Sequence, residues 1–231
     1  MNPPSITILE HREGILAIHK PPGLPATGKD LHDQNCAQFQ AIEHLRSMAW
    51  ALHQLDQDTS GLMLFATHKR LVALWQAHWS SSALQKIYVA LVHGRLPRRR
   101  VLIDAPLARA RRSGSRPIII SPEGRPAQTE AIELTTTGSY SLIAARLITG
   151  RTHQIRAHLE HIGTPLLGEA TYNSIPCGFH PRQALHALAI TSSSPLPALS
   201  LEAPLAADLL ELAARLDLYT DPLQDWRTLF P

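Results

Sequence analysis

The chain has little cysteine and no long apolar run, and these absences exclude several classes of protein. Its two cysteines, Cys36 and Cys177, are too few for a disulfide framework and lack the spacing of a metal site. No apolar run approaches the roughly 20 residues that a membrane-spanning helix needs. The N-terminus lacks the basic-then-apolar pattern of a signal peptide, and Pro3 and Pro4 would interrupt one. We therefore expect a reduced, cytoplasmic protein with no membrane partner.

Acidic and basic residues nearly balance, with a net charge of +3, but the basic residues are unevenly distributed. The segment 95–125 has only two acids, Asp104 and Glu123, against nine arginines: Arg95, Arg98, Arg99, Arg100, Arg109, Arg111, Arg112, Arg116 and Arg125. Because the planar fork of arginine suits phosphate, this excess predicts contact with a polyanion such as nucleic acid. The alternative is a solvated surface loop.

The hydrophobic pattern predicts more strands than helices, and hydrophobic residues make up 44% of the chain, enough for a sizeable core. Strands are predicted at residues 6–9, 14–18, 50–52, 62–66, 86–94, 128–136, 140–149 and 185–191. Helices are predicted at residues 33–47, 68–79, 150–163 and 206–218. Polar residues 10–13 predict a turn, and Gly138-Ser139 predicts a hairpin turn. Because the helices occur singly, we expect an α+β fold with a mixed, largely antiparallel sheet.

The polar turn between residues 53 and 61 is the first candidate site. Asp56 lies between two apolar runs, so its carboxylate would have a rigid backbone on both sides and aliphatic groups around it. That setting suits a nucleophile or a general base. Ordinary turn chemistry also explains the segment, because Asp, Thr and Ser cap backbone amides and Gly61 accepts a positive φ. From this stretch alone, the ordinary turn is the better explanation.

The predicted helix at residues 150–163 carries two arginines and three histidines. Arg151 lies near its start, where the helix dipole disfavours a cation, which suggests a separate role. Arg156 lies at the edge of the apolar stripe, and Asp56 is its natural anionic partner. Such a pair would keep the carboxylate ionised. A structural arginine with a packed stem and a solvated head is the alternative.

Six blocks of sequence stand out along the chain. They are Lys20-Pro21-Pro22-Gly23, residues 53–64, residues 86–94, residues 150–158, Pro165-Leu166-Leu167-Gly168 and Leu185-His186-Ala187-Leu188. In this order they resemble the RluA-type pseudouridine synthases, over about residues 6–205. The resemblance implies the pseudouridine synthase fold, with a central active-site cleft across one mixed sheet. It also implies a single catalytic domain over residues 1–231 without an N-terminal S4-like RNA-binding domain.

The resemblance implies an isomerase that converts specific uridines in structured RNA, a ribosomal or transfer RNA stem-loop, to pseudouridine without a cofactor or metal. Asp56 matches the family's catalytic aspartate, and Arg156 matches the arginine that pairs with it. Tyr88 matches the tyrosine that packs on the target base, and Leu185 matches an aliphatic residue that lines the base pocket. Whether Asp56 attacks the ribose or C6 of the base stays open. We expect the protein to act as a monomer.

Gln54 departs from the family pattern His-Arg-Leu-Asp, in which the arginine can wedge into the space near the flipped base. Glutamine can form hydrogen bonds but carries no charge, so the substrate site or the mode of base flipping is in question. We expect Gln54 and Arg151 to bind RNA. We expect the same of three arginines of the 95–125 segment, Arg109, Arg111 and Arg112.

Two other functions compete with the isomerase. A non-catalytic RNA-binding protein on the same fold would explain Gln54, but the presence of Asp56, Tyr88 and Arg156 argues against it. A metal-dependent hydrolase would use the histidines of residues 150–163. Only two of these histidines share a helix face, and no acidic general base lies at metalloprotease spacing.

Overall fold

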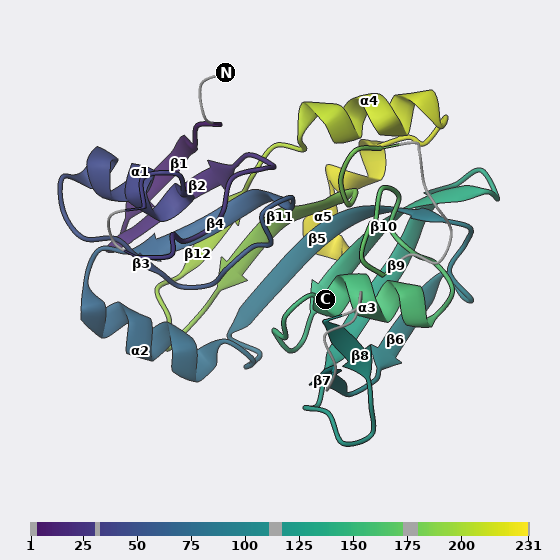
Figure 1. The fold of residues 1–231 in the computed structure, drawn as a ribbon, viewed down its shortest axis with the longest axis horizontal. Coiled ribbons are helices and arrows are strands. Elements are labelled where there is room, and N and C mark those ends of the chain that lie inside the picture. Colours follow the sequence, from purple (N-terminus) through teal and green to yellow (C-terminus); the bar gives the residue numbers. More distant parts are fainter. Residues whose placement is uncertain (1–3, 31–32, 111–116, 173–179, 231) are drawn as a thin grey trace. The chain divides into compact units, whose positions relative to one another are not determined.

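The computed structural model describes residues 4–30, 33–110, 117–172 and 180–230 (Figure 1). The chain divides into two compact units. The first contains Met1–Lys86 and His186–Ala206, and the second contains Ile87–Leu185 and Ala207–Pro231. Each unit is therefore completed by a segment that returns from much later in the sequence. Within the described residues, no helix combines the length and the apolar character needed to cross a membrane.

The first unit is built on a mixed sheet in which β1, β2, β4 and β11 are neighbours in that order. Its strands are β1 (Thr7–Arg12), β2 (Ile15–Lys20), β3 (Trp50–Ala51), β4 (Ser60–Ala66), β11 (Leu185–Ser192) and β12 (Leu199–Glu202). β3 pairs with β4 and β12 pairs with β11, both antiparallel, whereas β4 and β11 run parallel. All seven residues of β4 are buried, as its continuous apolar run predicts for a strand covered on both faces.

Two helices belong to the first unit, α1 (Ala37–Leu45) and α2 (Lys69–His78). Trp75 of α2 is fully buried and belongs to the same hydrophobic cluster as Leu62 and Leu64 of β4. Because these apolar side chains fill both sides of the contact, β4 is held firmly at the end of the turn that carries Asp56.

The second unit contains an antiparallel sheet in which β5, β10, β9 and β6 are neighbours in that order. These strands are β5 (Leu84–His93), β6 (Arg100–Asp104), β9 (Gln128–Thr136) and β10 (Tyr140–Leu147). A separate two-stranded hairpin consists of β7 (Leu107–Arg109) and β8 (Ile118–Ile120). The helices are α3 (Gln154–His161), α4 (Ala207–Arg215), the 3-10 turn η1 (Asp221–Leu223) and α5 (Trp226–Leu229).

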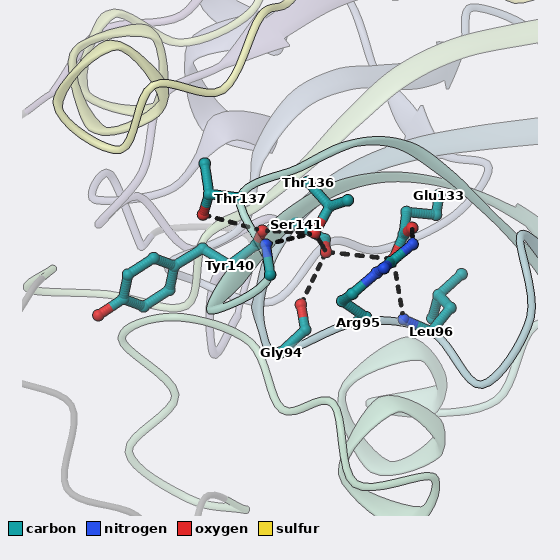
Figure 2. A network of polar contacts seen from close by, with 9 residues as sticks. Gly94, Arg95, Leu96, Glu133, Thr136, Thr137, Tyr140 and Ser141 are labelled. Atoms are coloured by element: carbon teal, nitrogen blue, oxygen red, sulfur yellow. Dashed lines mark hydrogen bonds and ion pairs between the residues drawn. The ribbon is translucent and has the colours of Figure 1, made fainter.

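Glu133 of β9 ties together the strand ends of the second unit (Figure 2). Its carboxylate accepts hydrogen bonds from Arg95 Nη2 (3.0 Å) and Leu96 N (3.1 Å). The Ser141 hydroxyl of β10 lies 2.7 Å from the Gly94 carbonyl oxygen and 3.3 Å from the Glu133 carboxylate. Because Glu133 is only 7% exposed, these donors satisfy a carboxylate that water hardly reaches.

The predicted α+β class and largely antiparallel mixed sheet are confirmed, as is the hairpin around Gly138-Ser139. The turn predicted at residues 10–13 is wrong in position. β1 continues through Arg12, and the chain reverses at Glu13 and Gly14, which both have positive φ (53° and 73°). The expectation of one catalytic domain over residues 1–231 stays a prediction.

Two further differences concern the basic segments. The arginine-rich segment is not one loop, because β6 pairs with β9 and β7 pairs with β8. The helix predicted at residues 150–163 begins only at Gln154, since His153 has the left-handed conformation (φ 51°). Arg151 therefore lies outside α3, and the argument from the helix dipole does not apply to it.

Gly61 allows β4 and β11 to approach closely. Its φ is 114°, and a Cβ there would lie 2.2 Å from the backbone oxygen of Ala187. We expect Gly61→Ala to lower the free energy of unfolding by at least about 3 kcal/mol, because backbone strain adds to a clash with backbone. Urea denaturation measures this loss. Gly138→Ala is the matched control, because Gly138 has φ 89° but no atom within 4 Å of the added Cβ. Equal losses in the two variants would contradict the close approach.

Candidate active site

Asp56 lies in a tight turn between β3 and β4. Its backbone carbonyl accepts a hydrogen bond from Thr59 N (3.0 Å). Leu55, directly before it, is 6% exposed, whereas Asp56 itself is half-buried. The turn therefore presents the carboxylate at the surface of the first unit while its backbone stays fixed by packing.

Lys20 anchors this turn to the loop that follows β2. Its ammonium is fully buried and donates hydrogen bonds to three backbone carbonyl groups, including those of Leu24 (2.8 Å) and Gln57 (2.8 Å). Gly23 N also donates to the Gln57 carbonyl (3.0 Å), and the Gln57 side-chain amide donates to the Gly23 carbonyl (3.1 Å). Because Gln57 follows Asp56 directly, these bonds fix the backbone of the candidate nucleophile.

Gln54 is exposed on the same turn. Its side-chain amide donates a hydrogen bond to the Thr27 hydroxyl (3.3 Å), which joins the turn to the loop after Pro25. A neutral, solvent-facing amide therefore occupies the position where the resemblance implies an arginine.

His53 is held neutral inside the first unit. Its ring stacks on Trp79, with 5.0 Å between centroids and 26° between planes. Leu64 N donates to His53 Nε2 (3.1 Å), so Nε2 must be unprotonated. Burial, and secondarily the charge of Lys86, lowers the pKa of His53 to about 3. Burial also lowers the pKa of Lys86 to about 8.

We expect His53 to make the protein less stable as pH falls from about 6.5 to about 3. In that range the unfolded chain binds a proton at His53 that the folded chain excludes, because the folded pKa is about 3 against a usual 6.5. The slope contributed is at most about 1.4 kcal/mol per pH unit. Urea denaturation at several pH values measures it. His53→Gln should flatten the slope, and the same change at the exposed His44 is the control. An unchanged slope in His53→Gln would contradict the neutral ring.

Arg156 of α3 is buried and forms a two-point ion pair with Glu169. Nε lies 2.7 Å from Glu169 Oε2, and Nη2 lies 2.8 Å from Oε1. Nη2 also donates to the Thr171 hydroxyl (3.2 Å), and the guanidinium carbon lies 5.2 Å from the centroid of the Tyr172 ring. The side chains of Arg156 and Glu169 are 8% and 1% exposed. The guanidinium is therefore fixed in one orientation.

The Glu169 carboxylate stays ionised despite its burial. Burial alone would raise its pKa, but the hydrogen bond and charge of Arg156 lower it, as do the backbone N–H groups of Thr171 (2.8 Å) and Tyr172 (3.3 Å). The net effect holds the pKa of Glu169 below its usual value. An ionised carboxylate at this position keeps the Arg156 charge balanced.

His153 and Tyr172 complete this cluster. His153 Nδ1 lies 2.7 Å from the Tyr172 hydroxyl, and the two rings meet edge to face at 5.7 Å. His153 is the residue with positive φ directly before α3. The polar contact with a tyrosine that is 2% exposed helps to hold this strained backbone.

Tyr88 lies in β5 and Leu185 in β11, each near one end of the range Ile87–Leu185 that belongs to the second unit. Tyr88 of β5 is 9% exposed and pairs with Ala145 of β10. Leu185 begins β11 and is 4% exposed, and its carbonyl accepts a hydrogen bond from Arg182 Nη1 (3.3 Å). Both side chains are therefore mostly packed, as groups lining an apolar site would be.

Of the predicted RNA-binding arginines, Arg109 and Arg151 lie within the described residues. Arg109 ends β7 and is exposed. Arg151 donates from Nε to the Pro126 carbonyl (3.0 Å), and its backbone N donates to Gln154 Oε1 (3.0 Å). Arg111 and Arg112 lie outside the described residues. Arg109 and Arg151 line the same pocket of the second unit.

The histidines of the 150–163 segment do not converge on one point. His158 is fully buried, and its two ring nitrogens lie 2.9 Å from the Thr129 hydroxyl and 2.9 Å from the Ala105 carbonyl oxygen. In the part of the chain that the structure describes, no three His, Cys, Asp or Glu side chains form a group able to hold a metal. His158 is thus a buried structural residue.

The sequence profile of the RNA pseudouridylate synthase family matches residues 14–161, more than half of the chain. The chain belongs to this family. The membership confirms the resemblance to RluA-type enzymes, and the enzymes of this family are isomerases, the class that the sequence predicts.

Curated relatives of this family member are also named as pseudouridine synthases. An uncharacterized RNA pseudouridine synthase of Chloroflexus aurantiacus is 42% identical over 161 residues, covering 68% of this chain and 50% of the relative. One from Bacillus subtilis is 30% identical over 220 residues, covering 91% of this chain and 76% of the relative. The ribosomal large subunit pseudouridine synthase C of Vibrio cholerae is 30% identical over 171 residues, covering 71% of this chain and 52% of the relative. The chain thus spans about half the length of two of these relatives.

Solved structures confirm the fold expected for the family. Human RNA pseudouridylate synthase domain containing 1 superposes with a TM-score of 0.78 at 23% identity, covering 100% of this chain and 99% of that one. Human RNA pseudouridylate synthase domain containing 4 has a TM-score of 0.77 at 23% identity, covering 93% and 94%.

Of the predicted catalytic residues of this pseudouridylate synthase family member, Asp56 belongs to the first unit, whereas Tyr88 and Arg156 belong to the second. The pairing of Asp56 with Arg156 stays a prediction. The sequence analysis missed Glu169 as a partner of Arg156. An acid directly after the block Pro165–Gly168 was the available signal, but nothing in the spacing linked it to residue 156.

Proposed function

We propose that this protein is an RNA pseudouridine synthase in which Asp56 is the catalytic carboxylate. The family match over residues 14–161 is the observation that carries the proposal. The half-buried position of Asp56, on a turn whose backbone is fixed through Gln57 and Lys20, supports its role, because a catalytic group gains from a rotamer set by packing.

The reaction exchanges one bond to the ribose for another. The N1–C1′ bond of uridine breaks with the help of the Asp56 carboxylate, the uracil rotates, and C5 bonds to C1′. The C5 proton is lost and N1 gains a proton, so the product is an isomer of the substrate. Tyr88 packs on the base and assists the proton transfer, while Leu185 lines the base pocket. The detached uracil must be kept from water, which suits side chains as packed as these two.

In this mechanism Arg156 pairs with Asp56. Glu169 already holds the guanidinium at two points, so its remaining donor positions are aimed in a fixed direction. No metal or cofactor is required, because the leaving group and the nucleophile are the same base.

The proposed substrate is a structured RNA, and ribosomal RNA comes first. The Vibrio cholerae relative is named for the large ribosomal subunit, and transfer RNA is the other RNA that we propose. The target uridine must leave its stack, at a cost of a few kcal/mol that is offset by stacking and phosphate contacts. Gln54, Arg109, Arg111, Arg112 and Arg151 would supply such contacts. We propose a monomeric, cytoplasmic enzyme.

Release of tritium from RNA labelled at C5 of uridine tests the proposal, because only bonding of C5 to the ribose expels that hydrogen. Purified protein is incubated separately with ribosomal and transfer RNA transcripts that lack modifications. We expect stoichiometric release from a single site in one of the two classes. No release from either class would overturn the proposed activity.

A further inference from the structure

The second unit contains a pocket of about 380 Å³ beside the β7–β8 hairpin. One wall comes from the hairpin, a second from the connection between β8 and β9, and a third from the segment directly before α3. Leu107 and Ile118 contribute to its lining from the hairpin, where they are only 5% and 7% exposed. The volume is near the lower end of the range for ligand sites, which begins at about 300 Å³.

Three arginines line this pocket, Arg109, Arg125 and Arg151, against one acid, Glu123. Among the described residues, none of the three guanidinium groups forms an ion pair with a carboxylate. Arg151 is fixed by the bond from its Nε to the Pro126 carbonyl (3.0 Å), which orients the rest of its guanidinium. Positive charge gathered in a concave site raises the local concentration of anions.

The backbone builds the pocket rigidly. Leu107 and Arg125 exchange two backbone hydrogen bonds, of 2.9 Å and 2.8 Å, so the segment of Arg125 lies against the start of the hairpin. Gly124 permits this approach, because a Cβ there would lie 2.6 Å from the backbone carbon of Leu107. α3 also packs against β8, and Ala157 of α3 shares a hydrophobic cluster with Leu107 and Ile118.

We propose that this pocket binds one nucleotide of the RNA substrate through its phosphate group, held between Arg109, Arg125 and Arg151. A guanidinium group can donate two parallel hydrogen bonds to the oxygens of one phosphate. The small apolar lining suits the sugar or base of the same nucleotide. The identity of the ligand rests on the proposed function, whereas the anion site itself does not. The proposal adds Arg125, Leu107 and Ile118 to the RNA-binding surface.

Arg125→Ala is the test variant, since truncating Arg151 would also remove its bond to Pro126. The matched control is Arg70→Ala, which removes the same charge from an exposed position in α2 of the first unit. RNA binding is measured by fluorescence anisotropy at several salt concentrations. We expect Arg125→Ala to weaken binding about tenfold near 0.1 M salt and to reduce the slope of log K against log salt by roughly 1. Arg70→Ala should weaken RNA binding by no more than about twofold and change the slope by no more than about 0.2.

Equal binding by Arg125→Ala and Arg70→Ala, with both proteins folded by thermal denaturation, would overturn the site. Competition with uridine monophosphate and with inorganic phosphate separates the sources of the phosphate. Weak, Arg125-dependent competition with bound RNA supports the proposal. Tight, Arg125-dependent binding of the free nucleotide, with RNA binding insensitive to Arg125, would overturn the RNA assignment. Arg125-dependent RNA binding in a protein that releases no tritium would refute the proposed activity and leave the pocket standing.

Discussion

Asp56→Asn is expected to lower the single-turnover rate of pseudouridine formation by at least about 10³-fold, which is about 4 kcal/mol of transition-state stabilisation. Asparagine has nearly the same shape and fits the same turn, but it can neither attack nor carry the negative charge that the bond cleavage needs. Tritium release at saturating RNA measures the rate. RNA binding and the urea midpoint should stay close to those of the native protein.

The matched control is Asp58→Asn, because Asp58 lies in the same turn and is also half-buried. If the turn only needed acidic side chains for its conformation, the two variants would lose activity to a similar extent. We expect Asp58→Asn to keep the rate within about tenfold of the native protein. Full activity in Asp56→Asn would remove Asp56 from the mechanism.

Glu169→Gln is expected to lower the free energy of unfolding by about 3–5 kcal/mol, because it leaves the buried Arg156 charge without its carboxylate. The pair is closed at two points, and neither side chain is more than 8% exposed. Urea denaturation at pH 7 measures the loss. The control is Glu10→Gln, since the Glu10–Arg12 pair has a similar separation of 2.9 Å but side chains that are 38% and 50% exposed. There the loss should stay under about 1 kcal/mol.

The cost of Glu169→Gln should also depend on pH. The pKa of Glu169 lies below its usual 4.5, so its ion pair contributes fully above that value and is lost as pH falls through the lowered pKa of the folded state. The difference between the native protein and the variant should therefore shrink toward pH 3. A difference that is small at pH 7, or independent of pH, would contradict the role assigned to this ion pair.

Local patterns predicted the parts of the fold that depend on neighbouring residues. Gly138, in a short polar turn between two β-rich runs, gave the hairpin of β9 and β10, and the unbroken apolar run gave the fully buried β4. Arg100 lies in β6, a strand that was not predicted because its segment is rich in basic residues. Its guanidinium forms an ion pair with Glu130 of β9 (3.0 Å), and its backbone pairs with that strand. Such compensation comes from residues 30 positions away, beyond the reach of a local pattern.

The same limit applies to the candidate site. α3 begins at Gln154 because His153 has the left-handed conformation, and His153 Nδ1 lies 2.7 Å from the hydroxyl of Tyr172, a residue 19 positions away. The ion pair of Arg156 with Glu169 could not be predicted, because nothing in the spacing links these two residues. The structure shows that Glu169 meets the guanidinium at two points. The pairing of Arg156 with Asp56 stays a prediction.

Mapping of pseudouridine in total RNA from cells with and without the gene tests the central claim most directly. The account predicts that at least one pseudouridine in ribosomal or transfer RNA disappears without the gene. It should return when the native protein is supplied, but not when Asp56→Asn is supplied at the same level. An unchanged set of pseudouridines, or full restoration by Asp56→Asn, would contradict the account.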